Sequence, residues 1–493
     1  MKKLLCIALI LALMLTTGTF VMAEEAAAAP KYVFLFIGDG QGIPQITAAQ
    51  FYLGTMENPD ASMPVPGHLS FTQFPYLGMV TTYDATSFCP DSSSTASAMA
   101  SGEKILSGSL NFNVELTDPL KIITEYIKES GTGRKVGVAT SVSLDHATPS
   151  AFYAKAASRS EYYNIATQGM GENSVLDYLA GGAFVRENGP DGVDENVYEI
   201  GKRNGFNIVD TNEGIRALNS ESGKTLVLTP GRESDGSLHY AIDSERRMAQ
   251  GEDVILLKDL VEAGINVLDN ENGFFFMVEG GKVDWAGHAN DAVTSIRETL
   301  NFSDAINVAI QFASEHPDET LIVVTGDHET GGLTIGFATT KYDTHFNYLY
   351  DQTISFYDFD KVIEELRAQG AGFTAALAEI EKYYGLTMSS ESPLYMTEAD
   401  LERLEYAFNL SMIPEDDREL TAADTLAYGG YEPLSMAVCH ILNNKAGIAY
   451  TSYSHTGLQL PVYATGVGAE KFAGLYDNTD IFFKMADVMN LEV

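Results

Sequence analysis

The sequence predicts an α/β fold with a central, mostly parallel sheet and helices on both faces. Four apolar runs are nearly continuous in Val, Ile, Leu and Phe, which is typical of strands covered on both faces. They cover residues 32–38, 135–141, 274–280 and 320–327. Helical patterns lie between them, for example over 120–129 and 291–314. With 493 residues and 45% hydrophobic content, the chain can bury a large core, so we expect one large domain that carries an insertion.

The insertion is expected from about residue 341 to residue 445. The runs 358–385 and 397–412 are helical, acidic and free of strand patterns, and the breaks SSESP and PEDD interrupt this region. The chain is then expected to return to a strand at GIAYTSYSH, residues 447–455. The insertion therefore precedes His455.

The N-terminus has the pattern of a secretory signal peptide. Two lysines precede an apolar run over residues 4–15, and Val21-Met22-Ala23 forms a small-residue cleavage pattern. The run is shorter than the ~20 residues of a membrane span, so an uncleaved anchor is the second interpretation. We expect a signal peptide over 1–23, a linker over 24–30, a folded domain over 31–493 without a stable membrane span, and a secreted or periplasmic location.

The charge of the chain restricts its partners. Thirty Lys and Arg against 68 Asp and Glu give a formal net charge of −38. Such a balance argues against nucleic acid or an anionic membrane as a specific partner, and it is typical of a solvated acidic surface.

Polar residues follow each of the four predicted strands. Ligands and catalytic groups gather at the carboxyl ends of strands in open α/β sheets. The residues at these ends are Asp39 after the first strand, Asp145, His146 and Thr148 after the second, Glu279 and Asp284 after the third, and Asp327 and His328 after the fourth. We expect them to lie along one edge of the sheet.

Several of these residues could bind metal ions. Asp284 and His288 lie four apart, on one face of a helix if the segment is helical, although such pairs are also common on surfaces. GDHETGG adds Asp327 and His328, FIGDGQG adds Asp39, and SHTG adds His455. A dinucleotide fingerprint in FIGDGQG fails because Ile43 stands where its last glycine belongs. With Glu279 there are seven oxygen and nitrogen ligands without cysteine, which suits two zinc-like ions and one magnesium-like ion.

A candidate nucleophile lies in CPDSSSTASAMASG, residues 89–102. Its serines begin an Ala-rich helical run, where free N–H groups favour an anion or alkoxide, although a serine-rich helix cap is the simpler interpretation. No histidine base is adjacent, so a metal would have to activate the hydroxyl. The residues alone do not choose among Ser92, Ser93 and Ser94. Arg159 could grip two phosphate oxygens or be only a surface charge.

Together these motifs resemble the metal-dependent alkaline phosphatases, from IGDG near the start of the mature chain to HTG near its end, in family order. The resemblance implies that Ser92 is the nucleophile, that Arg159 binds the phosphate, and that 31–493 is the catalytic domain. It implies one zinc on Asp284, His288 and His455, and another on Asp39, Asp327 and His328. A magnesium ion would take Asp39, Thr148 and Glu279.

The implied reaction is in-line hydrolysis of phosphate monoesters through a phosphoserine, and a homodimer is expected because the family commonly dimerises. Two residues depart from the enteric pattern. His146 replaces an Asp near the third metal, so its occupation by magnesium is open, and Trp285 replaces a Lys that contacts phosphate through water. A phosphodiesterase or phosphonate hydrolase of the same superfamily, and an exported metal- or phosphate-binding protein without turnover, are the alternatives.

Overall fold

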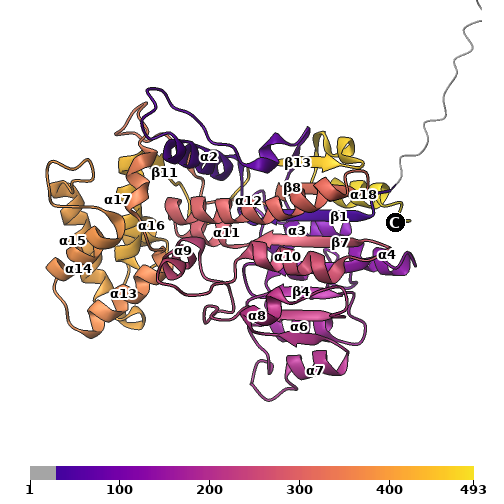
Figure 1. The fold of residues 1–493 in the computed structure, drawn as a ribbon. Helices are drawn as coiled ribbons and strands as arrows, with labels where there is room; N and C mark the ends of the chain where they lie inside the picture. Colours follow the sequence, from indigo (N-terminus) through magenta and orange to yellow (C-terminus); the bar gives the residue numbers. More distant parts are fainter. Residues whose placement is uncertain (1–28) are drawn as a thin grey trace, which may run out of the picture.

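The computed structural model describes residues 29–493, so the expected signal peptide (1–23) and most of the linker (24–30) lie outside the described residues. A ten-stranded sheet forms the centre, and β13 alone among its strands runs antiparallel to the rest (Figure 1). In order across the sheet the strands are β14 (Gly474–Asp477), β2 (Tyr76–Thr81), β13 (Leu460–Gly466), β8 (Thr320–Gly326), β1 (Tyr32–Gly38), β7 (Phe274–Gly280), β3 (Lys135–Thr140), β4 (Tyr178–Gly181), β6 (Thr225–Leu228) and β5 (Asn207–Val209). The predicted fold class is confirmed.

Helices cover both faces of the sheet, which explains why the central strands are apolar throughout. Alternate side chains of β1 enter two separate cores, Phe34 on one face and Leu35 on the other, and both are buried. The first face packs against α2 (Ile43–Glu57), α10 (Leu257–Leu268) and α12 (Ala292–Glu315). The second packs against α3 (Ser92–Ser101), α4 (Ile123–Glu129), α6 (Tyr162–Met170) and α18 (Thr479–Val488). Shorter helices are η1 (Ser70–Gln73), α5 (Ala147–Ser150), α7 (Val197–Arg203), α8 (Asn212–Arg216), α9 (Ala241–Ala249), α11 (Lys282–His288) and η4 (Ala469–Phe472).

The prediction of a strand over 447–455 is wrong. Only β11 (Ile448–Ala449) and β12 (His455–Thr456) form there, and each pairs with a short partner, β10 (Thr334–Ile335) or β9 (Glu329–Thr330). Between them the chain turns, because the backbone N–H groups of Thr451 and Ser452 both donate to the Gly331 carbonyl, at 3.0 Å each. The long strand of this region is β13, which starts after His455.

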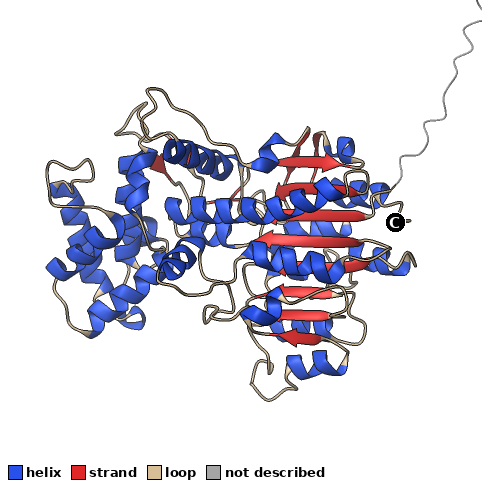
Figure 2. Cartoon of the chain, viewed as in Figure 1, coloured by secondary structure: helices blue, strands red, loops and turns tan. Residues whose placement is uncertain are grey.

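Helices dominate the region of the expected insertion. They are η2 (Phe346–Asp351), α13 (Phe356–Ala368), α14 (Phe373–Tyr384), α15 (Glu398–Ser411), η3 (Glu415–Asp417), α16 (Ala422–Tyr428) and α17 (Pro433–Ala446). Figure 2 shows them grouped beside one end of the sheet. The boundaries 341 and 445 stay a prediction. Within residues 29–493, no helix combines the length and apolar character needed to cross a bilayer.

Candidate active site

Three carboxylates lie along one edge of the sheet because three strands end at the same level. Gly38 of β1 is in register with Gly280 of β7 and with Gly326 of β8. Asp39 and Asp327 directly follow their strands, and Glu279 directly precedes Gly280. All three are buried. Parallel pairing of apolar strands therefore sets the spacing of the acidic residues.

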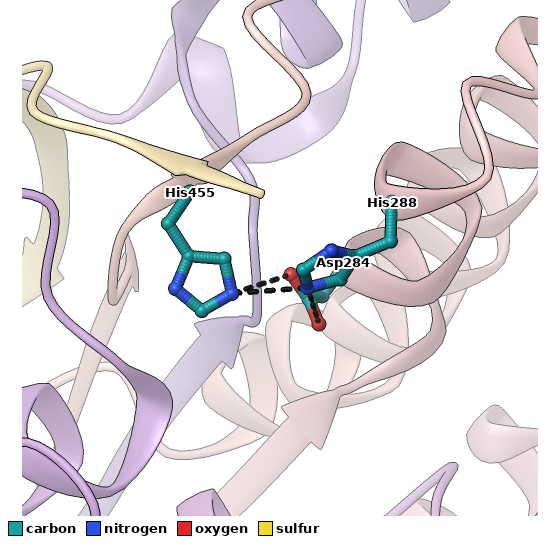
Figure 3. Close-up of side chains that lie close together, drawn as sticks. All are labelled: Asp284, His288 and His455. Atoms are coloured by element: carbon teal, nitrogen blue, oxygen red, sulfur yellow. Dashed lines mark hydrogen bonds and ion pairs between the residues drawn. The ribbon is translucent and has the colours of Figure 1, made fainter. Parts of the chain in front are cut away.

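The first ligand group consists of Asp284, His288 and His455, which point toward one another (Figure 3). Asp284 and His288 share one face of α11, and His288 Nε2 lies 3.4 Å from Asp284 Oδ2. His455 comes from β12, which pairs with β9 immediately after His328. Its Nε2 lies 3.0 Å from His288 Nε2. Gly40 allows this approach, because a Cβ there would lie 2.6 Å from the Asp284 Cα.

Hydrogen bonds to the other ring nitrogens orient both histidines for a cation. His288 Nδ1 lies 2.6 Å from the Tyr453 carbonyl, and His455 Nδ1 lies 2.6 Å from the Pro90 carbonyl. A carbonyl can only accept, so each Nδ1 carries a proton and, in the neutral ring, each Nε2 carries a lone pair. The two lone pairs face each other beside the Asp284 carboxylate. This arrangement suits a metal ion held by two imidazoles and a carboxylate.

The second ligand group consists of Asp39, Asp327 and His328, all buried. His328 Nε2 lies 3.3 Å from both Asp39 Oδ1 and Asp327 Oδ2. The backbone N–H groups of Gly40 and His328 donate to Asp327 Oδ1, at 3.1 and 2.8 Å, which orients Oδ2 toward the imidazole. The group again offers one nitrogen and two carboxylates to one cation.

The third ligand group consists of Asp39, His146 and Glu279. Thr148 donates its hydroxyl to Asp39 Oδ2 at 3.2 Å, so it lies beside this group, and the Thr140 hydroxyl donates to Glu279 Oε2. Glu279 Oε1 and His146 Nδ1 are buried, and neither has a hydrogen-bond partner among residues 29–493. Buried polar atoms without partners are costly, and a cation would satisfy Glu279 Oε1.

The buried charges of the site favour the binding of cations. Burial, followed by the neighbouring carboxylates, raises the pKa of Asp39 well above its usual range, that of Asp327 to about 7 and that of Glu279 to about 8. Burial opposes ionisation of His288 as well, but the Asp284 carboxylate outweighs burial and raises the pKa of His288 to about 9. Buried like charges of this kind are stable when they coordinate metal ions. The donor set therefore fits three cations.

Ser92 faces the second ligand group from the first turn of α3. Its Oγ lies 3.1 Å from His328 Nε2 and 3.4 Å from Asp39 Oδ1. The two serines left open by the sequence have other partners: the Ser93 hydroxyl donates to Asp91 at 2.6 Å, and the Ser94 hydroxyl donates to Asp84 at 2.8 Å. Of these three serines, therefore, Ser92 is the one whose hydroxyl contacts the second ligand group.

Arg159 lies in a loop before α6, with Nη1 3.0 Å from Asp91 Oδ2 and Nη2 3.4 Å from His146 Nε2. Burial opposes ionisation of Asp91, but the Arg159 guanidinium and the hydrogen bonds from Ser93 and Ser94 together outweigh it and lower the pKa of Asp91 to about 2. Burial, followed by the same guanidinium, lowers the pKa of His146 to about 3, so His146 is a neutral ring. Asp145 belongs elsewhere, since its carboxylate accepts from the Val185 N–H at 3.0 Å.

A cavity of about 430 Å³ opens over these groups. It is lined by Ser92, His146, Arg159, Asp235 and the first ligand group, and by five aromatic residues that we call the aromatic wall. Of the aromatic residues, sequence reasoning found only Trp285. The others are Tyr240, Phe356, Tyr357 and Tyr431, and no motif distinguished them because they lie in a loop and in the helical region.

Comparisons with known proteins find similar chains among the alkaline phosphatases. Alkaline phosphatases 4 and 3 of Bacillus subtilis (strain 168) are each 30% identical to this chain, with alignments covering 96% and 92% of it and 94% and 87% of the relatives. The crystal structure of a cold-active alkaline phosphatase from Shewanella sp. is similar at 27% identity and a TM-score of 0.74, over 93% of this chain and 99% of that chain.

The Thermus thermophilus alkaline phosphatase shares the fold, with a TM-score of 0.75 at 24% identity and 96% of each chain covered. The model of the family described as alkaline phosphatase matches residues 30–491. Because that match spans nearly the whole described chain, and the ligand groups lie within it, this protein belongs to the alkaline phosphatase family.

Proposed function

We propose that this chain hydrolyses phosphate monoesters through a phosphoserine formed on Ser92, with two zinc ions and one magnesium ion. Membership of the family indicates a phosphatase that acts on phosphate esters. One observation carries the finer proposal: the Ser92 hydroxyl contacts the second ligand group, with Oγ 3.1 Å from His328 Nε2, and borders the cavity that the first ligand group also lines.

The donor atoms support these metals. The first and second ligand groups combine imidazole nitrogen with carboxylate oxygen, as zinc prefers. Glu279, Asp39 and Thr148 supply the oxygen ligands that magnesium prefers, while the His146 nitrogen beside them makes zinc a competitor. Cations bound there would lower the pKa of a nearby hydroxyl or water and offset the charge of a phosphate.

Arg159, Asp91 and Ser92 then have separate roles in the reaction. Arg159 binds two oxygens of the phosphate through its planar fork, and Asp91 holds the guanidinium in place at 3.0 Å. Ser92 Oγ bonds to phosphorus as the bond from phosphorus to the ester oxygen on the opposite side breaks, and the proton lost by Ser92 passes to water, which in turn protonates the departing alkoxide. A water then attacks the phosphoserine, which releases phosphate and restores the Ser92 hydroxyl. The first turn of α3 favours negative charge at this position.

Hydrolysis of p-nitrophenyl phosphate at about pH 9 tests this proposal, because metal-activated hydroxyls favour alkaline conditions. Wild-type activity should disappear with EDTA and return with zinc and magnesium. Ser92→Ala should lose at least ~10³-fold in kcat. Ser94→Ala is the matched control on the same helical turn and should retain most activity. An inactive, metal-loaded wild type would favour a binding protein without turnover.

The same assay separates monoester from diester hydrolysis. Methyl p-nitrophenyl phosphate has the same leaving group but only one phosphate charge, so it gains less from the cationic site. We expect a preference of at least ~100-fold for the monoester in kcat/KM. Comparable rates for the two substrates would favour the phosphodiesterase alternative.

We also propose that the chain is exported to the periplasm or the cell exterior. The support is the pattern of residues 1–23, in which lysines, an apolar run and small residues follow one another. N-terminal sequencing of the protein from its own host should begin near Glu24. A mature protein that still starts at Met1 would contradict export by cleavage.

A further inference from the structure

The aromatic wall of the cavity takes no part in the mechanism proposed above. Trp285 on α11, Tyr357 on α13 and Tyr431 just before α17 are half-buried and line the same cavity as Ser92 and Arg159. An aromatic surface facing a phosphate site is placed to contact the remainder of the ester. Two of the three rings come from the helical region 341–445.

The wall is a packed assembly. Behind the half-buried rings lie Tyr240 and Phe356, which are 1% and 5% exposed. Phe356 packs edge-to-face against Tyr240, with ring centroids 5.5 Å apart, and against Tyr431, at 6.1 Å. Tyr357 lies 6.1 Å from Tyr240. Rings held in this way contact a ligand at a low cost in conformational entropy.

Asp291 connects the aromatic wall to the helices that carry and follow the first ligand group, α11 and α12. Its buried carboxylate caps α12 by accepting from the Thr294 N–H at 3.0 Å, and it also accepts from the Phe356 N–H at 2.9 Å. The first turn of α13 is therefore fixed to the corner between α11 and α12, three residues after His288. Asp291 is a positioning residue for Phe356 and Tyr357.

We propose that Trp285, Tyr357 and Tyr431 form a leaving-group subsite that favours phosphate esters of flat aromatic alcohols over esters of small alkyl alcohols. This inference rests on the proposed phosphomonoesterase function. Cationic leaving groups gain less, because Lys282 Nζ already lies 3.7 Å from the Tyr240 ring centroid and Lys361 Nζ 4.5 Å from that of Tyr357. The subsite thus selects flat groups by stacking.

Competitive inhibition by benzylphosphonate and methylphosphonate tests the subsite without a leaving-group effect on the chemistry. Wild-type enzyme with its metals should bind benzylphosphonate at least about tenfold more tightly, a difference of ~1.4 kcal/mol. The double variant Tyr357→Leu, Tyr431→Leu should bind the two phosphonates with inhibition constants that differ by no more than about threefold. Its inhibition constant for inorganic phosphate should stay near the wild-type value, which also shows that the site is folded. Tyr342→Leu, at a fully exposed tyrosine near the start of the insertion, is the matched control and should keep the wild-type ratio.

A binding measurement keeps this test separate from turnover. Trp285 is the sole tryptophan of the chain, so selectively excited fluorescence reports directly on the wall. Benzylphosphonate should change this fluorescence at concentrations where methylphosphonate does not. If no ester is hydrolysed but the fluorescence keeps this preference, the proposed function fails and the subsite stands. Three results would overturn the subsite. The wild type could bind benzylphosphonate and methylphosphonate equally, or the double variant could keep the wild-type ratio of the two inhibition constants. The fluorescence could also respond more strongly to 2-aminoethylphosphonate than to benzylphosphonate.

Discussion

Replacing Asp291 with asparagine should weaken the hydrogen bonds that join the first turn of α13 to the start of α12, and so lower the stability of the protein. Asp291 Oδ1 accepts from the Thr294 N–H at 3.0 Å and from Gln352 Nε2 at 2.8 Å, and Oδ2 accepts from the Phe356 N–H at 2.9 Å. An asparagine must turn its amide nitrogen toward one of these sets, so one buried backbone N–H loses its acceptor whichever way it turns. A buried donor without a partner costs about 1–3 kcal/mol. Because Gln352 is affected too, we expect the free energy of unfolding to fall by about 2–4 kcal/mol.

Urea unfolding of the metal-loaded protein at about pH 8 measures this loss, followed by Trp285 fluorescence and far-UV circular dichroism. Thr397→Ala is the control, because Thr397 caps α15 at an exposed position by accepting from the Asp400 N–H, and its loss should cost about 1 kcal/mol. Asp291→Asn should also weaken the preference for benzylphosphonate. A loss of stability no larger than that of the control would refute the reasoning.

Three further predictions follow from the charges of the site. In the folded chain without cations, the pKa of Glu279 is raised to about 8 and that of Asp327 to about 7, so the folded chain binds these protons more tightly than the unfolded chain. The Tm of EDTA-treated protein should therefore decrease as the pH rises from about 5 to about 8. Calorimetry should show a wider gap between metal-loaded and EDTA-treated protein at the higher pH, and a constant gap would contradict the prediction. Arg159→Lys keeps the charge but loses the fork, so kcat/KM should fall by roughly 10- to 100-fold and further in Arg159→Ala, and equal losses in the two variants would argue against two-oxygen binding. Trp285→Lys should lower the inhibition constant for phosphate by about tenfold, and an unchanged constant would refute a contribution from a cation at this position.

The sequence predicted those parts of the site that depend on strand ends. Asp39, Glu279 and Asp327 follow from apolar runs that stop at acidic residues, because a parallel sheet aligns the carboxyl ends of its strands. The pairing of Asp284 with His288 follows from helical spacing alone. The choice of Ser92 needed either the family resemblance or the partners that the structure gives to Ser93 and Ser94.

The aromatic wall could not be predicted in the same way. Tyr357 and Tyr431 lie in helical segments whose periodicity describes only local packing, and their place at the cavity depends on contacts with Tyr240 and Asp291, far away in the chain. The turn over 450–454 failed as a predicted strand for a similar reason, since the hydrogen bonds of Thr451 and Ser452 to Gly331 are long-range.

The first ligand group draws its third member from β12, more than 400 residues beyond Asp39 in the second. During synthesis, therefore, no N-terminal portion of the chain that stops short of His455 can hold the full set of ions. The second and third ligand groups need no residue beyond His328, whereas the first group is complete only after the chain has passed through the helical region and β12 has paired with β9. A chain that ended before His455 would lack β13 and β14 of the sheet as well as one member of the first ligand group, so completion of this group coincides with completion of the sheet.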